Sequence, residues 1–189
     1  NLNQKKKGKL SKVLMLVLST ALGYSQDFLG IKVDGNRQDC INKFLAKGFK
    51  TSIAPSNTVT SLKGMVGNDK VELMIVSTPI TKKVWKFSVF LPERTTWSSL
   101  KSNYEYYVDL LTTKYGEPTS TYSNFISPYY EGDGYEMTGV KIEKCNYMTF
   151  WDNVYIEITK WSQVCIHYEN TTNADLNKEE KDKINLKNF

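Results

Sequence analysis

The sequence has little of what metal or nucleophile chemistry needs. Its 189 residues include one histidine and three cysteines. The thiols stand at none of the Cys/His spacings typical of zinc sites, so we expect no metal site. The histidine, His167, lies two residues after Cys165 on an alternating strand, about 6.5–7 Å away, which is loose for a nucleophile–base pair. We therefore expect His167 on a polar, exposed face and predict no catalytic residue.

The cysteines are also too few, and odd in number, to form a disulfide framework. Cys145 and Cys165 are the obvious partners, with Cys40 left over. In a simple meander their strands are first and third in order, about 9–10 Å apart. A disulfide needs Cα atoms about 4.4–6.8 Å apart. We expect three free thiols, although a strand order other than the meander would allow the pairing.

An excess of charge is missing once the first 25 residues are set apart. The whole chain has 25 basic and 20 acidic residues, but residues 1–25 hold five lysines and no acid. The remainder therefore carries 20 of each sign. It lacks the excess of Lys and Arg that neutralises phosphates. We expect no nucleic-acid partner.

No apolar run is long enough to cross a bilayer, which takes about 20 residues. Residues 1–25 combine a basic start, the apolar run Val13–Leu18, and the small residues Gly23 and Ser25 at positions −3 and −1. This pattern indicates a secretory signal peptide cleaved before Gln26, with a buried helix or short anchor as the alternative. No cysteine stands at the cleavage point for acylation. We predict an exported protein, periplasmic or extracellular, with no stable transmembrane anchor after cleavage.

What the sequence does contain is one long amphipathic helix. From Trp97 to Tyr115 the apolar residues recur at the spacing of a single helical face. Thr95 or Thr96 can cap its start, and Gly116 can close its end. Strand-like sequence lies on both sides, so we expect this helix to cover the apolar face of a sheet.

The remaining pattern predicts an α+β fold with an antiparallel meander sheet, helices on one face and water on the other. We expect a first helix over 37–47 and strands over 59–66, 70–77, 84–91, 119–126, 139–150, 154–159 and 163–169. A helix followed by three or four strands occurs twice. This predicts a tandem αβββ duplication, with chance recurrence of the same order as the alternative.

The predicted domain covers 26–173, with repeat halves over about 26–92 and 93–173. A charged helix or tail over 174–189 follows it. Only Leu176 and two residues near its end, Ile184 and Leu186, have apolar side chains that can anchor this tail. We therefore expect a frayed or lightly docked helix.

A glycine-rich loop after the long helix gathers three tyrosines that follow no helix or strand period. They are Tyr129, Tyr130 and Tyr135. Tyrosine rings offer large, stiff contact area, so these three are the predicted ligand-binding residues. The alternative is that the rings fold back over the edge of the sheet.

Three acids share this loop, Glu131, Asp133 and Glu136. Their oxygens have the chemistry to ligate calcium, but the twelve-residue calcium-loop pattern is missing. We expect a solvated acidic loop and no cofactor.

Short motifs along the chain resemble a family of uncharacterised exported proteins from Bacteroidetes. They are Phe28-Leu29-Gly30-Ile31 through Asp34-Gly35, Phe44-Leu45-Ala46-Lys47-Gly48-Phe49, Lys114-Tyr115-Gly116-Glu117-Pro118 and Tyr168-Glu169-Asn170. The duplicated helix-plus-sheet order is also similar to the fold of β-lactamase inhibitor proteins and of small outer-membrane assembly lipoproteins. The resemblance implies a binding or scaffolding module and assigns no functional residues. The missing acylation cysteine departs from the lipoprotein group.

These observations predict an exported, non-enzymatic module that binds an unknown protein of the cell envelope through a sheet face or the tyrosine loop. A glycan-binding accessory protein is the first alternative, and exposed parallel aromatic rings would indicate it. A hydrolase is the second, and it requires acids that converge in a cleft with shifted pKa values.

Overall fold

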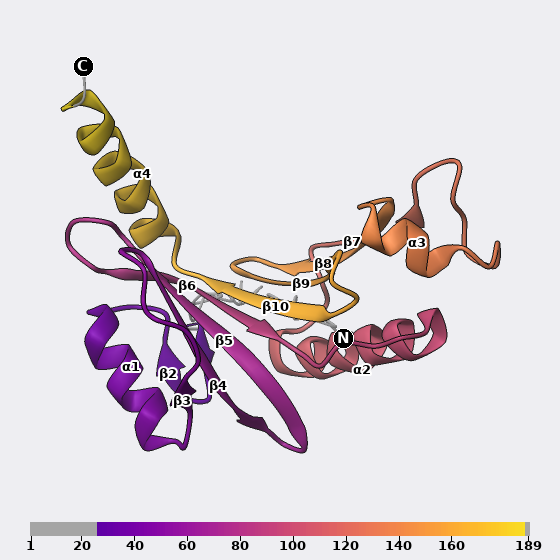
Figure 1. Ribbon diagram of the computed structural model, residues 1–189, viewed down its shortest axis with the longest axis horizontal. Coiled ribbons are helices and arrows are strands. Elements are labelled where there is room, and N and C mark those ends of the chain that lie inside the picture. The colour runs from indigo at the N-terminus through magenta and orange to yellow at the C-terminus, as the bar shows by residue number, and fades with distance from the viewer. Residues whose placement is uncertain (1–25, 188–189) are drawn as a thin grey trace, which may run out of the picture.

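A computed structural model describes residues 26–187 of the chain, so the predicted signal peptide lies outside the described residues. The elements are β1 (Asp27–Phe28), β2 (Ile31–Lys32), α1 (Arg37–Ala46), β3 (Lys50–Thr51), β4 (Val59–Val66), β5 (Asp69–Ser77), β6 (Val84–Phe90), α2 (Trp97–Tyr115), β7 (Ser120–Phe125), α3 (Glu136–Lys141), β8 (Cys145–Trp151), β9 (Val154–Ile158), β10 (Val164–Glu169) and α4 (Thr171–Leu186). Strands β3 to β10 form one eight-stranded antiparallel sheet, which confirms the α+β class (Figure 1). Within 26–187, no helix combines the length and apolarity needed to span a membrane.

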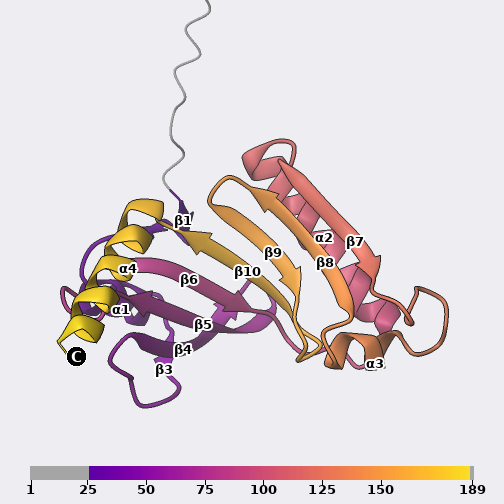
Figure 2. The same ribbon diagram turned by 90° about the horizontal axis from the view of Figure 1, so that it is seen from above.

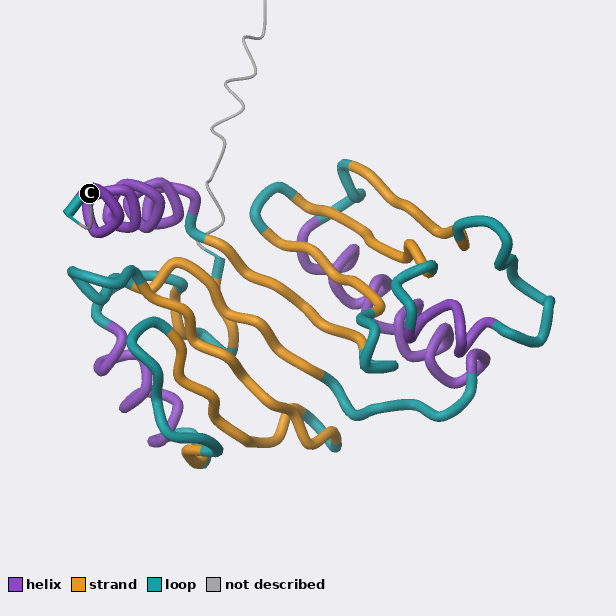
Figure 3. Tube along the Cα trace, turned by 45° about the horizontal axis from the view of Figure 1, so that its top comes forward, coloured by secondary structure: helices purple, strands orange, loops and turns teal. Residues whose placement is uncertain are grey.

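The sheet consists of two meanders that meet at their last strands. Its order is β3-β4-β5-β6-β10-β9-β8-β7, and β6 pairs with β10 (Figure 2). A single meander would place β7 beside β6. Instead the chain passes through α2 to the far edge of the sheet and returns inward from β7 to β10. Each half has a helix followed by four strands, and in the second half the short helix α3 stands between β7 and β8 (Figure 3). This order is consistent with the duplication, which stays a prediction.

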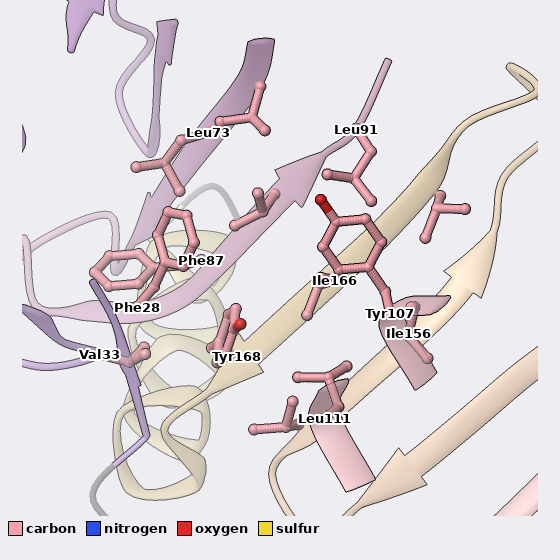
Figure 4. Packing of buried hydrophobic residues seen from close by; sticks show 14 of the residues in the cluster. Phe28, Val33, Leu73, Phe87, Leu91, Tyr107, Leu111, Ile156, Ile166 and Tyr168 are labelled. Carbon is pink, nitrogen blue, oxygen red and sulfur yellow. The ribbon is translucent and has the colours of Figure 1, made fainter. Parts of the chain in front are cut away.

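Helices α1 and α2 lie on the same side of the sheet, as expected (Figure 1). α2 begins where predicted, because Thr96 accepts a hydrogen bond from the Ser99 amide at 3.3 Å, and ends where Gly116 adopts a φ of 85°. Its buried residues, Leu100, Tyr104, Tyr107 and Leu111, face the sheet. Side chains from both halves join one apolar cluster between the helices and the strands (Figure 4).

The predicted strand over 139–150 is wrong in its first half. Residues Glu136–Lys141 form the short helix α3, and β8 starts only at Cys145. Gly139 of this helix packs closely against β7, since a Cβ added there would lie 3.1 Å from the Phe125 ring. A residue without a side chain allows the helical turn to pack against β7 at this point.

Polar residues anchor helix α4, and of the three apolar side chains that the sequence indicated only Leu176 is half-buried. Ile184 and Leu186 are 37% and 74% exposed. Asn173, Asn177 and Glu180 are buried instead. The helix also starts earlier than 174, because the Asn170 side chain accepts a bond from the Asn173 amide at 3.0 Å. Buried polar groups anchor a helix only when they are hydrogen-bonded, which a hydropathy pattern does not reveal.

The Glu180 carboxylate joins α4 to the loop between β5 and β6. It accepts bonds from the Ile80 amide at 2.6 Å, from the Thr81 amide at 3.1 Å and from Thr81 Oγ1 at 2.5 Å. Burial raises the pKa of Glu180, but these hydrogen bonds outweigh it, so the net pKa lies below the ordinary value of 4.5. The stabilisation is therefore complete above about pH 4.5 and is lost as the pH falls through the lower, folded-state pKa.

Glu180→Gln should loosen α4 while leaving the sheet intact. We expect amide hydrogen exchange in α4 to become about tenfold faster at pH 7, because charge-assisted bonds are lost. In the unmodified protein, protonation of Glu180 at acid pH should increase the opening of α4. The Glu180→Gln variant should lack this pH dependence. Glu179→Gln, at an exposed neighbouring position, is the matched control and should leave exchange unchanged. Equal exchange in the two variants would contradict the anchoring role.

Candidate functional site

The side of the sheet opposite α1 and α2 is the first candidate surface. Within the described chain no helix crosses it between α4 at one end and α3 at the other (Figures 1 and 2). Strand register brings one row of side chains across the join, from Met74 on β5 to Phe150 on β8. We call this surface the uncovered face; its residues are Ser61, Lys63, Glu72, Met74, Lys86, Ser88, Phe90, Tyr122, Met148, Phe150, Tyr155, Glu157, Cys165, His167 and Glu169.

His167 lies at the centre of the uncovered face and is only 6% exposed. Its Nδ1 is 2.9 Å from Ser88 Oγ, and its Nε2 is 2.9 Å from Glu157 Oε1. The Tyr155 ring stacks on it at 4.3 Å between centroids. The prediction of an exposed histidine is therefore wrong. The error follows from the strand order, which places β10 in the middle of the sheet with β6 and β9 on its two sides.

The His167 ring is held in its neutral form. Burial lowers its pKa most, the hydrogen bond that it donates to Glu157 raises it in part, and the charge of Lys86 lowers it, so the net pKa is below 6.5. A neutral imidazole has one donor and one acceptor nitrogen. Donation from Nε2 to Glu157 and acceptance at Nδ1 from Ser88 satisfy both nitrogens.

The Ser88–His167–Glu157 chain resembles a catalytic arrangement only in its residue types. Ser88 is 5% exposed, and Cys165, whose Sγ lies 4.0 Å from His167 Nδ1, is fully buried. Burial also raises the pKa of the Cys165 thiol, which disfavours the nucleophilic thiolate. A nucleophile must be reachable by the substrate atom that it attacks. The geometry fits a rigid polar support better than a reacting group.

The charged groups of the uncovered face largely pair with one another. Lys86 Nζ donates to the Tyr155 hydroxyl at 2.6 Å and lies 3.0 Å from a carboxylate oxygen of Glu169. Glu157 is bonded to His167, and Glu72 accepts a bond from Ser61. The face therefore presents apolar and aromatic side chains around internally satisfied polar groups.

The three predicted binding tyrosines differ in exposure. Tyr130 and Tyr135 are 65% and 66% exposed, whereas Tyr129 is half-buried. Asp133 shapes this loop, because its carboxylate accepts bonds from the amides of Tyr130 at 3.0 Å and Tyr135 at 2.6 Å. Two of the rings are thus free to contact a ligand, and binding by this loop stays a prediction.

One acid of the tyrosine loop, Glu131, holds the loop to α2 and β8. Glu131 accepts bonds from Trp97 Nε1 at 3.3 Å, Lys101 Nζ at 2.5 Å and the Tyr147 hydroxyl at 2.9 Å. The bond from Lys101 is the largest cause that lowers the pKa of Glu131. Glu131 is exposed, as expected, but its hydrogen bonds also join the loop to α2 and β8. Residues 26–187 contain no group of three or more His, Cys, Asp or Glu placed to hold a metal ion.

All three cysteines are free, as expected. Cys145 begins β8 and Cys165 lies on β10, and β9 separates the two strands. The meander holds within this half of the sheet, so the spacing argument against a disulfide applies.

Comparison of the chain with protein-family models, with curated proteins and with solved structures gave no match. The uncovered face and the tyrosine loop are therefore the features of the described chain that bear on function.

Proposed function

We propose that this chain is an exported, non-enzymatic module that binds the folded surface of another protein through the uncovered face. The observation that carries the proposal is a set of half-buried apolar side chains on that face, over which no described helix lies. They include Met74, Phe90, Met148 and Phe150. Apolar patches left open on a folded protein are typical of interaction sites.

The size and composition of the uncovered face suit a protein partner. In sheet order, six strands lie between and including β5 and the edge strand β7. Neighbouring strands are about 4.8 Å apart, so the face is about 24 Å wide. A specific protein interface covers about 800 Å² on each partner. Methionine and aromatic residues, which the uncovered face contains, are enriched in such interfaces.

The buried network supports binding by keeping the face rigid. Ser88, His167 and Glu157 link three adjacent strands, and Tyr155 packs on the histidine. A surface that is already ordered loses less conformational entropy when a partner binds.

The two alternatives have less support. Tyr155 stacks between Phe150 at 5.4 Å and His167 at 4.3 Å, so neither side of its ring is open to a sugar. A glycan-binding function therefore depends on more exposed rings, such as those of Tyr122, Tyr130 and Tyr135. For a hydrolase, carboxyl groups with raised pKa values should converge, but the carboxyl pKa values resolved as shifted within 26–187 are lowered, those of Asp34, Glu131 and Glu180.

Met148→Lys should abolish partner capture without unfolding the protein. Met148 is half-buried and pairs with Glu157 on β9, so the new ammonium has a carboxylate beside it. A charge at the centre of an apolar interface costs about 2 kcal/mol or more, which is about thirtyfold in affinity. The measurement is pull-down from cell-envelope extract with the tagged protein, combined with thermal unfolding.

Leu110→Lys is the matched control, since Leu110 is 46% exposed on α2, away from the uncovered face. It should leave capture unchanged. Tyr130→Ala with Tyr135→Ala tests the tyrosine loop in the same assay. Loss of capture in the loop variant alone, or capture that glycosidase treatment abolishes, contradicts the proposal.

A further inference from the structure

Strand β7 is an unprotected edge of the sheet. The opposite edge is β3, which has only two residues, one of them Lys50. Proteins usually protect edge strands by shortness, charge, proline or a bulge. β7 has six residues, Ser-Thr-Tyr-Ser-Asn-Phe, with no charge and no proline, and it pairs with β8 in unbroken register. Figure 2 shows no described element beyond it.

The backbone of β7 offers hydrogen-bonding groups to this edge. The Ile126 amide donates to the Lys144 carbonyl oxygen at 2.8 Å, so even-numbered residues turn their N–H groups toward β8. Backbone groups alternate in direction along a strand, so Thr121 and Ser123 turn theirs outward. Both residues are exposed. A further strand can therefore pair with β7 without displacing another part of the described chain.

The space beside this edge is acidic. A cavity of about 300 Å³ lies between β7 and α2, and Thr121, Ser123, Glu105 and Asp109 are among the residues that line it. The one lysine of its lining, Lys101, is already paired with Glu131 at 2.5 Å and Glu105 at 3.8 Å. The lining thus holds three carboxylates, those of Glu105, Asp109 and Glu131, against one lysine, and an added strand would place alternate side chains next to this net negative charge. Its other side chains would lie beside Tyr122, which is 49% exposed.

We propose that β7 accepts an extended segment of another protein as a ninth strand, with Lys or Arg at alternate positions facing α2 and apolar residues facing the side of Tyr122. A second copy of this chain fits less well. Pairing of β7 with β7 about a two-fold axis would bring the acidic α2 flanks of both copies together. This inference goes beyond the proposed function and does not depend on the uncovered face.

The probe is a capped synthetic peptide of alternating Lys and Val, eight residues long, added to the full chain and followed by NMR. We expect the amide resonances of Thr121 and Ser123 to shift on binding and their hydrogen exchange to slow. A peptide with Glu in place of Lys should bind about tenfold more weakly. A peptide N-methylated at every amide should not bind, because it lacks the strand-pairing donors.

Variants of the protein separate backbone pairing from other contacts. Ser123→Pro removes an outward amide and should abolish binding, whereas Ser123→Ala should keep it. Glu105→Gln with Asp109→Asn should reduce the preference for the Lys peptide over the Glu peptide. If Ser123→Pro does not fold, the three peptides on the unmodified protein still decide.

Equal affinity for the Lys and Glu peptides overturns the proposal, as does undiminished binding of the methylated peptide. Lys-peptide binding weaker than about 1 mM also overturns it. A protein dimer in sedimentation that Ser123→Pro abolishes would assign the edge to a second copy and overturn it as well.

Discussion

Phe87→Ala is expected to lower the free energy of unfolding by about 3–5 kcal/mol, because it removes a fully buried ring from the middle of the core. Phe87 lies on β6, its ring centroid is 5.3 Å from that of Phe44 on α1, and its register partner on β10 is Tyr168. It therefore contacts the first helix and lies directly at the join of the two meanders. Total stability is usually about 5–15 kcal/mol, so this loss would leave the protein marginal at 25 °C.

Urea-induced unfolding followed by circular dichroism and tryptophan fluorescence measures this loss. Both probes should report the same destabilised transition, since the apolar cluster includes residues of both halves. Phe90→Ala is the matched control on the same strand, where the ring is half-buried on the uncovered face. Its cost should be clearly smaller. Similar losses in the two variants would contradict the assignment of Phe87 to the core and Phe90 to the open surface.

His167→Leu is expected to cost about 1–3 kcal/mol at pH 7 and to remove a pH dependence that the unmodified protein shows. Leucine fills the space but leaves the buried Ser88 hydroxyl without its partner. Because the folded-state pKa of His167 lies below 6.5, the folded protein binds the proton less well than the unfolded chain. Stability should therefore decrease as the pH falls from 6.5 toward the folded-state pKa.

The pH dependence between pH 7 and 5 can be assigned to His167 because the chain has only one histidine. The measurement is the free energy of unfolding in urea at several pH values between 7 and 5. His167→Gln is the control, since it keeps polar atoms near Ser88 but does not titrate. It should show a smaller loss than His167→Leu and the same flat pH profile. A pH slope that persists in both variants would show that another group is responsible.

The sequence predicted the elements that local patterns determine. The bounds of α2 agree with the predicted helix, because its apolar face, threonine cap and closing glycine are all local signals. The strand over 59–66 agrees with β4 for the same reason. The free thiols also followed, because β8, β9 and β10 form the simple meander that the argument assumed.

The features that the sequence did not predict depend on long-range pairing. Nothing local indicates that β10 pairs with β6, and this pairing is what buries His167 beside Ser88. The anchoring of α4 through Glu180 likewise needs two amides located about 100 residues earlier in the chain. For the candidate site, the sequence indicated which residues form the tyrosine loop. It indicated the uncovered face only as one face of a sheet and named none of its residues.

The most direct test of a binding uncovered face is site-specific photo-crosslinking in living cells of the source organism. A photoreactive phenylalanine analogue replaces one of three aromatic residues: Phe90 on the uncovered face, Tyr130 in the loop or Tyr106 on the outer side of α2. Tyr106 is 58% exposed and serves as the matched control. The account predicts a discrete protein adduct from Phe90 and none from Tyr106. Adducts from Tyr130 or Tyr106 without any from Phe90 would contradict it.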